Sequence, residues 1–483
     1  MDRIPDIATS SPSSGIQKIP THIRGLDDIL HGGLPAGRVT LVNGSAGTGK
    51  TVLGLEFLYR NALEGYPGLF ISFEETGAHI RQNALSFGWD LKALENAGKL
   101  FMMEAALEPE IFVSGGFNLK GLLAILEGKA RDLGTRWVVI DALDCLLRFW
   151  NDPFEEQQQT AVLYSWLRKR SMTAILTAKS PKTPAKASWA NDLDFMADCV
   201  IYLDQRVKDQ VNTKRLQIIK YRGSGYESNE CPFLISDEGM FFYAVSDMVL
   251  HYAAAVTRAS SGIPSLDDLL GGGYKQGSSI LISGASGVGK SAMASAFARC
   301  AAENKEKVLY VNYEESPEEM VANMNSMGID LRPIIEKGSL RILSVMPESL
   351  GIEEHLYQKM IAIDRFQPVH VVLDAVSACK RIAGDRAAFD FVMRLVYFCK
   401  SRGITILLIN QVENFFGDGQ LSGIGVSSVI DTIIALRYMD DDNETRRILK
   451  VIKSRGGRHS NKYHHFRLTD HGVAIDQAPD PEI

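Results

Sequence analysis

Two glycine-rich segments in this chain have the residue types and the spacing that hold the phosphates of a nucleotide. Both satisfy G-x-x-x-x-G-K-[ST], at residues 44–51 and 284–291 of a chain of 483 residues. The glycines let successive backbone N–H groups turn toward phosphate oxygens, the lysine reaches the β- and γ-phosphates, and the last hydroxyl is offered to Mg²⁺. The sequence therefore predicts two sites for ATP and Mg²⁺. Their residues are Gly47, Thr48, Gly49, Lys50 and Thr51 in the first copy and Gly287, Val288, Gly289, Lys290 and Ser291 in the second.

Carboxylates end two further apolar runs in each copy. Asp141 and Asp374 each end an apolar strand-like run, the Walker B arrangement in which an aspartate helps to hold hydrated Mg²⁺ beside the hydroxyl of Thr51 or Ser291. A pair of glutamates ends another run, where one member could accept a proton from an attacking water or hydroxyl. We therefore predict that Glu74, Glu75, Glu314 and Glu315 are catalytic residues, together with the P-loop lysines Lys50 and Lys290.

Two basic residues alternate near the end of each copy, Lys220 with Arg222 and Lys453 with Arg455. Alternate residues of a strand face the same side, and two like charges there repel each other unless an anion lies between them. A γ-phosphate would be such an anion. Because the pairs are far along the chain from the P-loops, we predict that they reach the nucleotide of a neighbouring subunit in a ring. Ordinary exposed strand charges are the alternative.

A pair of hydroxyls, Ser427 and Ser428, occurs in the second copy alone, because Asp194 and Phe195 hold the corresponding positions of the first. The pair follows a glycine-rich segment, 417–425, and precedes a strand-like run, so it could approach a bound ATP as a phosphate acceptor. Adjacent serines before a strand are more often turn or cap residues, and this alternative stays open on these residues alone.

The chain is an internal duplication of an α/β domain. Adding 240 carries the first P-loop onto the second, and adding 233 carries Asp141 onto Asp374. Strand-like runs alternate with longer helical patterns, which predicts a mostly parallel sheet with helices on both faces and ligands at the carboxyl ends of the strands. The expected organisation is a disordered leader at 1–15, a first domain at 16–246, a linker at 247–261 and a second domain at 262–483.

Composition excludes several classes of protein. A net charge of −6 argues against a nucleic-acid-binding surface, which would carry a basic field. The six cysteines form no C-x-x-C pair, which favours reduced thiols over disulfides or zinc. No run of 18 apolar residues is present, and the first residues lack the pattern of a signal peptide. The sequence therefore predicts a cytoplasmic protein without a membrane segment.

The motifs together resemble the KaiC family of circadian clock ATPases, two-domain relatives of the RecA and RadA recombinases. The likeness runs from about Ile16 to about Ile475 and is most specific at Gly32-Gly33-Leu34-Pro35, Phe73-Glu74-Glu75-Thr76, residues 86–91 and the segment that begins at Ser427. The resemblance implies tandem RecA-like P-loop domains that bind ATP and Mg²⁺ at the subunit interfaces of a double-ringed homohexamer. It also implies a slow ATPase in the first domain and an autokinase and autophosphatase in the second.

The resemblance assigns further residues by position. It makes Ser427 and Ser428 the phosphate acceptors and gives the pair Glu314 and Glu315 the roles of base and metal contact, with Glu314 counted among the metal residues. Tyr226 stands where the first domain of the family carries a histidine. The residues implied to line a nucleotide or to contact its γ-phosphate across a subunit interface are Ser86, Lys220, Arg222, Tyr226, Met327, Arg447, Lys453 and Arg455.

The sequence thus predicts an ATP-hydrolysing serine/threonine autokinase that acts in timing or stress signalling. A KaiB-like partner is expected, whereas the short end after Asp470 argues against a KaiA-like activator. One alternative is a RecA/RadA-like nucleic-acid motor, which the acidic balance disfavours. The other is a nucleotide-gated scaffold that modifies nothing, which a mass measurement after incubation with ATP would separate from the autokinase.

Overall fold

The computed structural model describes residues 15–105, 119–147, 150, 152–179, 193–208, 211–242, 257–412, 425–441 and 444–476. The chain divides into two compact units, Met1–Asp247 and Met248–Ile483. The expected leader, apart from Gly15, most of the expected linker and the glycine-rich segment before Gly425 lie outside the described residues. Each unit has its own sheet.

The first sheet has nine strands in the order β11-β10-β9-β8-β3-β7-β6-β4-β5. The six strands from β8 to β5 are parallel, and β9, β10 and β11 add an antiparallel extension. A mostly parallel sheet, as predicted, is therefore confirmed. The strands are β3 (Val39–Gly44), β4 (Gly68–Ser72), β5 (Leu100–Glu104), β6 (Trp137–Asp141), β7 (Thr173–Lys179), β8 (Cys199–Lys208), β9 (Val211–Tyr221), β10 (Cys231–Ser236) and β11 (Gly239–Phe242).

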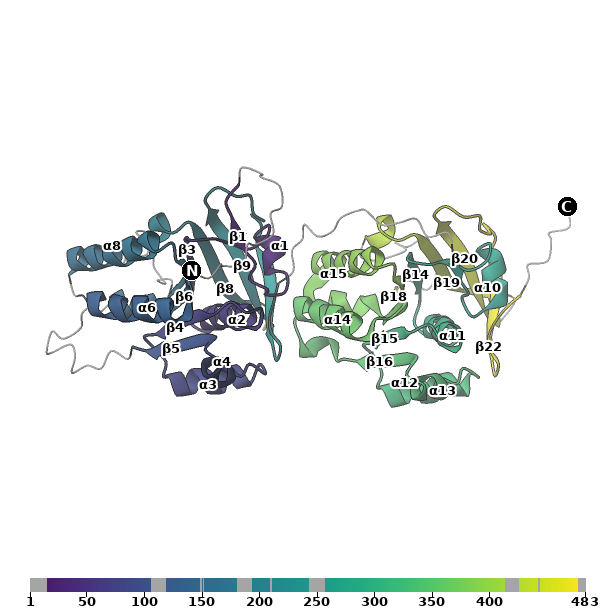
Figure 1. Cartoon of the computed structure of the whole chain (residues 1–483). Helices are drawn as coiled ribbons and strands as arrows, with labels where there is room; N and C mark the ends of the chain where they lie inside the picture. Colours follow the sequence, from purple (N-terminus) through teal and green to yellow (C-terminus); the bar gives the residue numbers. More distant parts are fainter. Residues whose placement is uncertain are drawn as a thin grey trace. The chain divides into compact units, whose positions relative to one another are not determined.

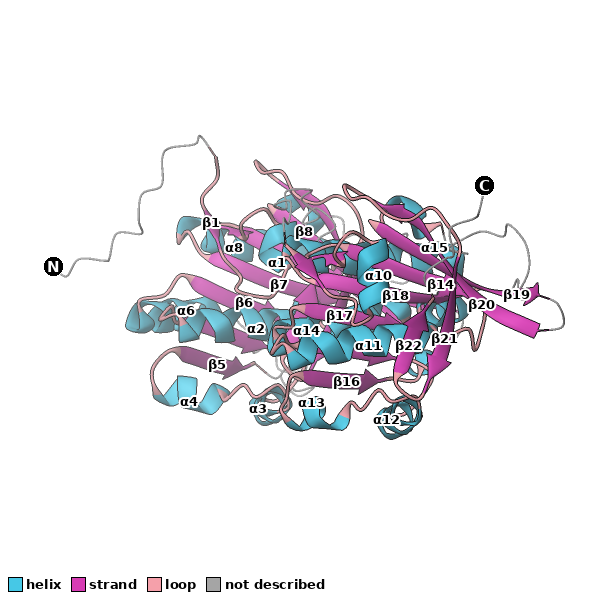
Figure 2. Ribbon diagram, turned by 90° about the vertical axis from the view of Figure 1, so that its right-hand side faces the viewer, coloured by secondary structure: helices cyan, strands magenta, loops and turns pink. Residues whose placement is uncertain are grey.

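The second sheet repeats this topology from edge to edge, in the order β16-β15-β17-β18-β14-β19-β20-β21-β22 (Figure 2). Two short pairs, β1 with β2 and β12 with β13, precede the P-loop strands, and β12 lies inside the range expected as a linker. The strands of the second sheet are β14 (Ser279–Gly284), β15 (Val308–Asn312), β16 (Leu340–Ser344), β17 (His370–Asp374), β18 (Thr405–Gln411), β19 (Thr432–Asp441), β20 (Glu444–Ser454), β21 (His464–Thr469) and β22 (Gly472–Ile475); the short ones are β1 (Lys18–Ile19), β2 (Leu34–Pro35), β12 (Arg258–Ala259) and β13 (Tyr274–Lys275).

Helices cover both faces of each sheet, because successive strand residues point to opposite sides. In the first unit Val139 packs with α2, whereas Val138 and Ile140 pack with α6 and α8, which lie on the other side of the sheet (Figure 1). The helices of the first unit are α1 (Leu26–Ile29), α2 (Lys50–Leu63), α3 (Gly77–Leu85), α4 (Leu91–Asn96), α6 (Leu119–Leu133), α7 (Leu143–Leu147) and α8 (Pro153–Lys169). Those of the second are α10 (Pro264–Leu269), α11 (Lys290–Glu303), α12 (Pro317–Ser326), α13 (Arg332–Glu336), η3 (Pro347–Ser349), α14 (Ile352–Phe366), α15 (Val376–Ser401) and η4 (Val426–Ser428).

Each sheet therefore has two ends with different chemistry. We call the end at which the parallel strands finish the carboxyl edge and the opposite end the amino edge. Both P-loops follow their strands directly, β3 before α2 and β14 before α11, so both lie at a carboxyl edge. Among the described residues no helix is long and apolar enough to cross a membrane.

Candidate nucleotide-binding and catalytic site

Both P-loops have the backbone shape that the sequence predicts for a phosphate cradle. Gly47 and Gly49 have φ angles of 77° and 97°, in the left-handed region that glycine tolerates, and Gly49 caps the start of α2. The Lys50 ammonium donates to the backbone oxygens of Gly44 at 3.0 Å and of Ser45 at 2.8 Å, and burial lowers its pKa. Lys290 donates in the same way to Ala285, at 2.6 Å. Each lysine is thus held against the loop that would wrap the phosphates.

The Walker B carboxylates lie beside the P-loop hydroxyls. In the first unit the Thr51 hydroxyl donates to Asp141 Oδ2 at 3.0 Å, and Thr177 donates to Oδ1 at 2.5 Å. In the second, Ser291 and Tyr310 bond to Asp374, the latter at 2.9 Å, and burial raises the pKa of Asp374 to about 6.

These oxygen donors suit Mg²⁺. Among the described residues no group of three or more His, Cys, Asp or Glu side chains could hold a metal ion. One carboxylate and one hydroxyl beside a phosphate cradle are nevertheless what Mg²⁺ needs when it is bound together with a nucleotide.

The paired glutamates reach the same edge from a neighbouring strand. Tyr313 donates its backbone N–H to the backbone oxygen of Asp374 at 2.8 Å, which places Glu314 directly beyond the Walker B strand. Both Glu314 and Glu315 are exposed. In the first unit Glu74 forms an ion pair with Lys179, at the end of β7. The equivalent strand position of the second unit is Gln411, which cannot form such a pair.

Replacing Lys179 by glutamine, the residue of the second unit, is expected to speed ATP hydrolysis by the first unit. The ion pair holds the Glu74 carboxylate and makes it less available as a base, so its loss should raise turnover about two- to fivefold. ADP release measured in a Glu314→Gln, Glu315→Gln background would report on the first unit. The reverse change, Gln411→Lys, is the matched variant and should slow the second unit; unchanged rates in both would contradict this role.

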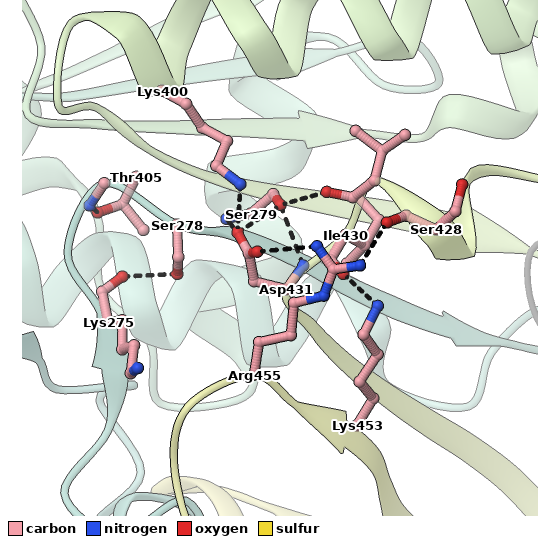
Figure 3. A network of polar contacts seen from close by, with 12 residues as sticks. Lys275, Ser278, Ser279, Lys400, Thr405, Ser428, Ile430, Asp431, Lys453 and Arg455 are labelled. Carbon is pink, nitrogen blue, oxygen red and sulfur yellow. Dashed lines mark hydrogen bonds and ion pairs between the residues drawn. The ribbon is translucent and has the colours of Figure 1, made fainter. Parts of the chain in front are cut away.

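The basic pairs lie at the amino edge, where each holds backbone carbonyl groups. Lys453 Nζ donates to the oxygens of Ser427 at 2.9 Å and Ile430 at 2.7 Å, and Arg455 donates to that of Ser428 at 2.7 Å (Figure 3). Lys220 and Arg222 hold the corresponding Phe195 carbonyl of the first unit, at 3.1 and 2.8 Å. Two cations thus lie together in each unit, as their alternate spacing predicts.

The strand register separates these cations from the P-loop of their own unit. Arg455 bonds to Asp431 and Asp431 to Ser279 through the backbone, so Arg455 is level with the first residue of β14. The P-loop begins at the other end of that strand, at Gly284. At about 3.3 Å per residue the separation is roughly 17 Å. Arg455 therefore cannot contact a γ-phosphate held by its own P-loop. Lys453 is level with Leu281, nearer the P-loop, but its ammonium is bonded to the Ser427 and Ile430 carbonyls of the amino edge.

Asp431 fixes the chain directly after the two serines. Its Oδ2 accepts from Lys400 Nζ at 2.7 Å and from the N–H and hydroxyl of Ser279 at 3.0 Å (Figure 3). These partners lower the pKa of Asp431 despite its burial. Ser427 and Ser428 lie in η4 just before it, and both are exposed. The hydroxyl pair is therefore attached to a rigid anchor on the same edge as the basic pair.

Comparison with known proteins identifies this architecture. The KaiC ATPase family model matches residues 19–246 and, a second time, residues 259–480. The chain belongs to the KaiC family. It is 36% identical over 473 residues to the circadian clock protein KaiC2 of Synechocystis sp., covering 97% of this chain and 83% of that protein. It is 34% identical over 468 residues to the circadian clock oscillator protein KaiC of Synechococcus elongatus, covering 96% and 90%.

Membership of the KaiC family confirms the predicted family and fold, and with them nucleotide binding and ATPase activity. Neither alternative function, the nucleic-acid motor or the scaffold, is favoured by these matches. The family assignment leaves the individual site residues to be argued from the geometry of this chain.

The remaining predicted residues of this KaiC-family protein lie at several places. Arg447 lies over the Tyr438 ring, 5.7 Å from its centroid, and the Tyr438 hydroxyl comes within 3.3 Å of where a side chain at Gly287 would begin. Arg447 therefore belongs to the P-loop edge of its own unit. Ser86 and Met327 cap the ends of α3 and α12, the helices that follow the paired glutamates. Tyr226 follows β9 and packs against the core of the first unit.

Three contacts of the site were missed by sequence reasoning. Thr177 and Tyr310 hold the Walker B carboxylates, and Lys179 holds Glu74. The available signal was a polar residue within an otherwise buried apolar strand, which needs a partner. Their partners come from other strands, so this signal points to a contact without naming it.

Proposed function

We propose that the second unit transfers the γ-phosphate of ATP to Ser427 and Ser428 of a neighbouring copy of the chain, and that the first unit hydrolyses ATP with water. One observation carries this proposal. The exposed serines and the basic pair of Lys453 and Arg455 share the amino edge, whereas the P-loop lies at the carboxyl edge. A second copy, docked head to tail, would bring its P-loop to the serines and to the cations together.

The side chains of the two copies would then have separate roles. Glu314 or Glu315 accepts the proton of the serine hydroxyl. At the same time the serine oxygen forms a bond to the γ-phosphorus, and the bond between that phosphorus and ADP breaks. Lys290 holds the β- and γ-phosphates, and the neighbour's Lys453 and Arg455 stabilise the charge on the transferred group. Mg²⁺, held by Ser291, Asp374 and Glu314, would neutralise charge on the phosphates. In the first unit Glu74 or Glu75 accepts the proton of water.

Closed rings of these units are part of the proposal, with a homohexamer as the expected form. The named relatives are circadian clock proteins, so we propose a role in timing or stress signalling within the cytoplasm. A KaiB-like protein is the proposed partner.

Incubation with labelled ATP tests the acceptor assignment. A Ser427→Ala, Ser428→Ala double variant is expected to lose the incorporated label and to keep the ATP turnover of the first unit. Ser401→Ala removes another exposed hydroxyl, on α15, and should leave labelling unchanged. Label that persists in the double variant rejects these acceptors, and turnover without any label in the unchanged protein favours the scaffold alternative.

A further inference from the structure

A buried cluster of polar side chains lies directly behind the paired glutamates of the second unit. It consists of Tyr313, His355, Lys359 and Cys379, with exposed fractions of 5%, 0%, 1% and 0%. Tyr313 follows β15 and precedes Glu314, while the others come from α14 and α15. Lysine is among the residues least often fully buried, so this cluster requires an explanation.

The hydrogen bonds of the cluster fix where its protons lie. His355 Nε2 is 2.7 Å from the Pro347 carbonyl oxygen, which can only accept, so Nε2 carries the ring proton. His355 Nδ1 is then an acceptor for Lys359 Nζ, at 3.1 Å. The same ammonium lies over the Tyr313 ring, 5.1 Å from its centroid, and the His355 ring meets Tyr313 edge-on. Lys359 is thus held between an imidazole and the face of an aromatic ring.

The first unit has apolar side chains at the four equivalent positions. The shifts that align the two copies carry Tyr313 onto Phe73, His355 onto Leu122, Lys359 onto Leu126 and Cys379 onto Leu146. All four of these first-unit residues are buried in one hydrophobic cluster. The fold is therefore stable with an apolar packing here, and replacing buried charges by apolar residues is often neutral or stabilising. Stability does not account for the polar cluster of the second unit.

We propose that Lys359 is a positioning residue for the second site: its ammonium, oriented by His355, holds the Tyr313 ring and through it the backbone that presents Glu314 and Glu315. Tyr313 is the last residue before the glutamates, and its N–H is bonded to Asp374. The Asn312 side chain accepts from the N–H groups of Glu314 and Glu315 directly, at 2.9 and 3.4 Å, so the Tyr313 ring acts on these residues through the backbone that it shares with Glu314. The inference rests on the proposed function, in which these glutamates serve phosphoryl transfer to Ser427 and Ser428.

The charge of Lys359 gives the second site a pH dependence that the first lacks. The groups that face Lys359 are His355 on α14, Tyr313 after β15 and Cys379 on α15; Glu348 acts on His355 and Arg381 on Cys379. Burial lowers the pKa of Lys359 to about 8, so the contact with the ring is lost as the pH rises through 8. The contribution of Lys359 to the stability of the fold has the opposite pH dependence. It is present above pH 10.5, the pKa of an unfolded lysine, and is lost as the pH falls through 8.

Lys359→Met in the full chain separates positioning from folding. In a Glu74→Gln, Glu75→Gln background, phosphate incorporation and ADP release report on the second unit. The rate is expected to fall about three- to tenfold, as for the loss of one cation–π contact. The melting temperature at pH 7 should rise, because a buried charge is removed, and the fall in rate between pH 7 and 9 should disappear. Leu126→Met, at the equivalent place of the first unit, is the control. It should leave the rate of the second unit, its pH dependence and the melting temperature unchanged.

An unchanged rate in Lys359→Met overturns the proposal, as does a lower rate joined to a lower melting temperature, which would make the residue structural. Should Lys359→Met fail to fold, the pH dependence of the rate of the unchanged second unit tests the proposal instead.

The pKa of both P-loop lysines is also lowered by burial, so their titration could change the rate of either unit. The rate of the first unit, measured in a Glu314→Gln, Glu315→Gln background, is therefore the reference. A second-unit rate that follows the first between pH 7 and 9 rejects the proposal. If the unchanged protein incorporates no phosphate, the proposed function is rejected. The role of Lys359 is then still tested by the rate at which the second unit releases ADP.

Discussion

Two variants that are each inactive are expected to restore phosphorylation when they are mixed. The first is Lys453→Ala, Arg455→Ala, which lacks the cations of the amino edge. The second is Glu314→Gln, Glu315→Gln, which lacks the base of the carboxyl edge but retains its P-loop. Because Arg455 is level with Ser279, a strand length from the P-loop of its own unit, a complete site needs both edges from different copies. Each variant alone should lose roughly 10³-fold in phosphate incorporation.

For the mixture, the proposal predicts both the amount of phosphate incorporated and the chain that carries it. In random rings at equal amounts, about a quarter of the interfaces join an intact carboxyl edge to an intact amino edge. Incorporation should recover to about that fraction. The label should appear on Ser427 and Ser428 of the glutamate variant, the chain that cannot itself catalyse, because its amino edge is intact.

Intact-mass measurement with one variant isotopically heavy identifies the labelled chain. Each variant mixed with a heavy copy of itself is the control and should stay unlabelled. Rings that contain both variants but show no recovery would contradict a shared site. Label on the serines of the lysine and arginine variant would place the acceptor beside its own P-loop, against the strand register.

The features that sequence reasoning predicted are those with a local physical cause. The P-loop needs glycines at left-handed positions directly before a helix, and Gly47, Gly49, Gly287 and Gly289 have such angles. Asp141 and Asp374 end buried strands of parallel sheets, so their carboxylates had to reach the carboxyl edge. Alternate spacing likewise placed Lys453 and Arg455 together. What the spacing could not give was the strand order, which places that pair far from its own P-loop.

The contacts that sequence reasoning missed join strands or helices that are distant in the chain. Lys179 and Glu74 lie on β7 and beyond β4, and Thr177 of β7 bonds to Asp141 of β6. A polar residue at such a place predicts that a partner exists, and the partner's identity depends on the packing of the whole unit. Comparing the halves was more informative at Lys359, because Leu126 shows what the same fold uses when no polar group is needed.

Asp374→Asn is expected to make the nucleotide-free protein more stable while the second unit loses metal-dependent nucleotide binding. Burial raises the pKa of Asp374 to about 6, so this carboxylate is charged at pH 7 in surroundings that favour its neutral form. Stability from such a group is fully present below its unfolded pKa of 3.8 and is lost as the pH rises through 6. Asparagine keeps the size of the side chain and an oxygen that can accept from Tyr310. Removing the charge should therefore raise the melting temperature at pH 7.

The same change removes the carboxylate proposed to hold Mg²⁺, and binding of Mg²⁺ with a nucleotide at the second unit should weaken about 100-fold. Calorimetry in the presence and absence of Mg²⁺ measures both effects on one sample. In the unchanged protein, binding at the second unit should weaken as the pH falls below 6, because the protonated acid is a poor ligand, and Asp374→Asn should not show this dependence. Asp141→Asn is the matched change in the first unit, where burial also raises the pKa of the aspartate. A variant that melts lower than the unchanged protein, or that binds Mg²⁺ with nucleotide equally well at both units, would place the metal on other oxygens and leave Asp374 a purely structural partner of Tyr310.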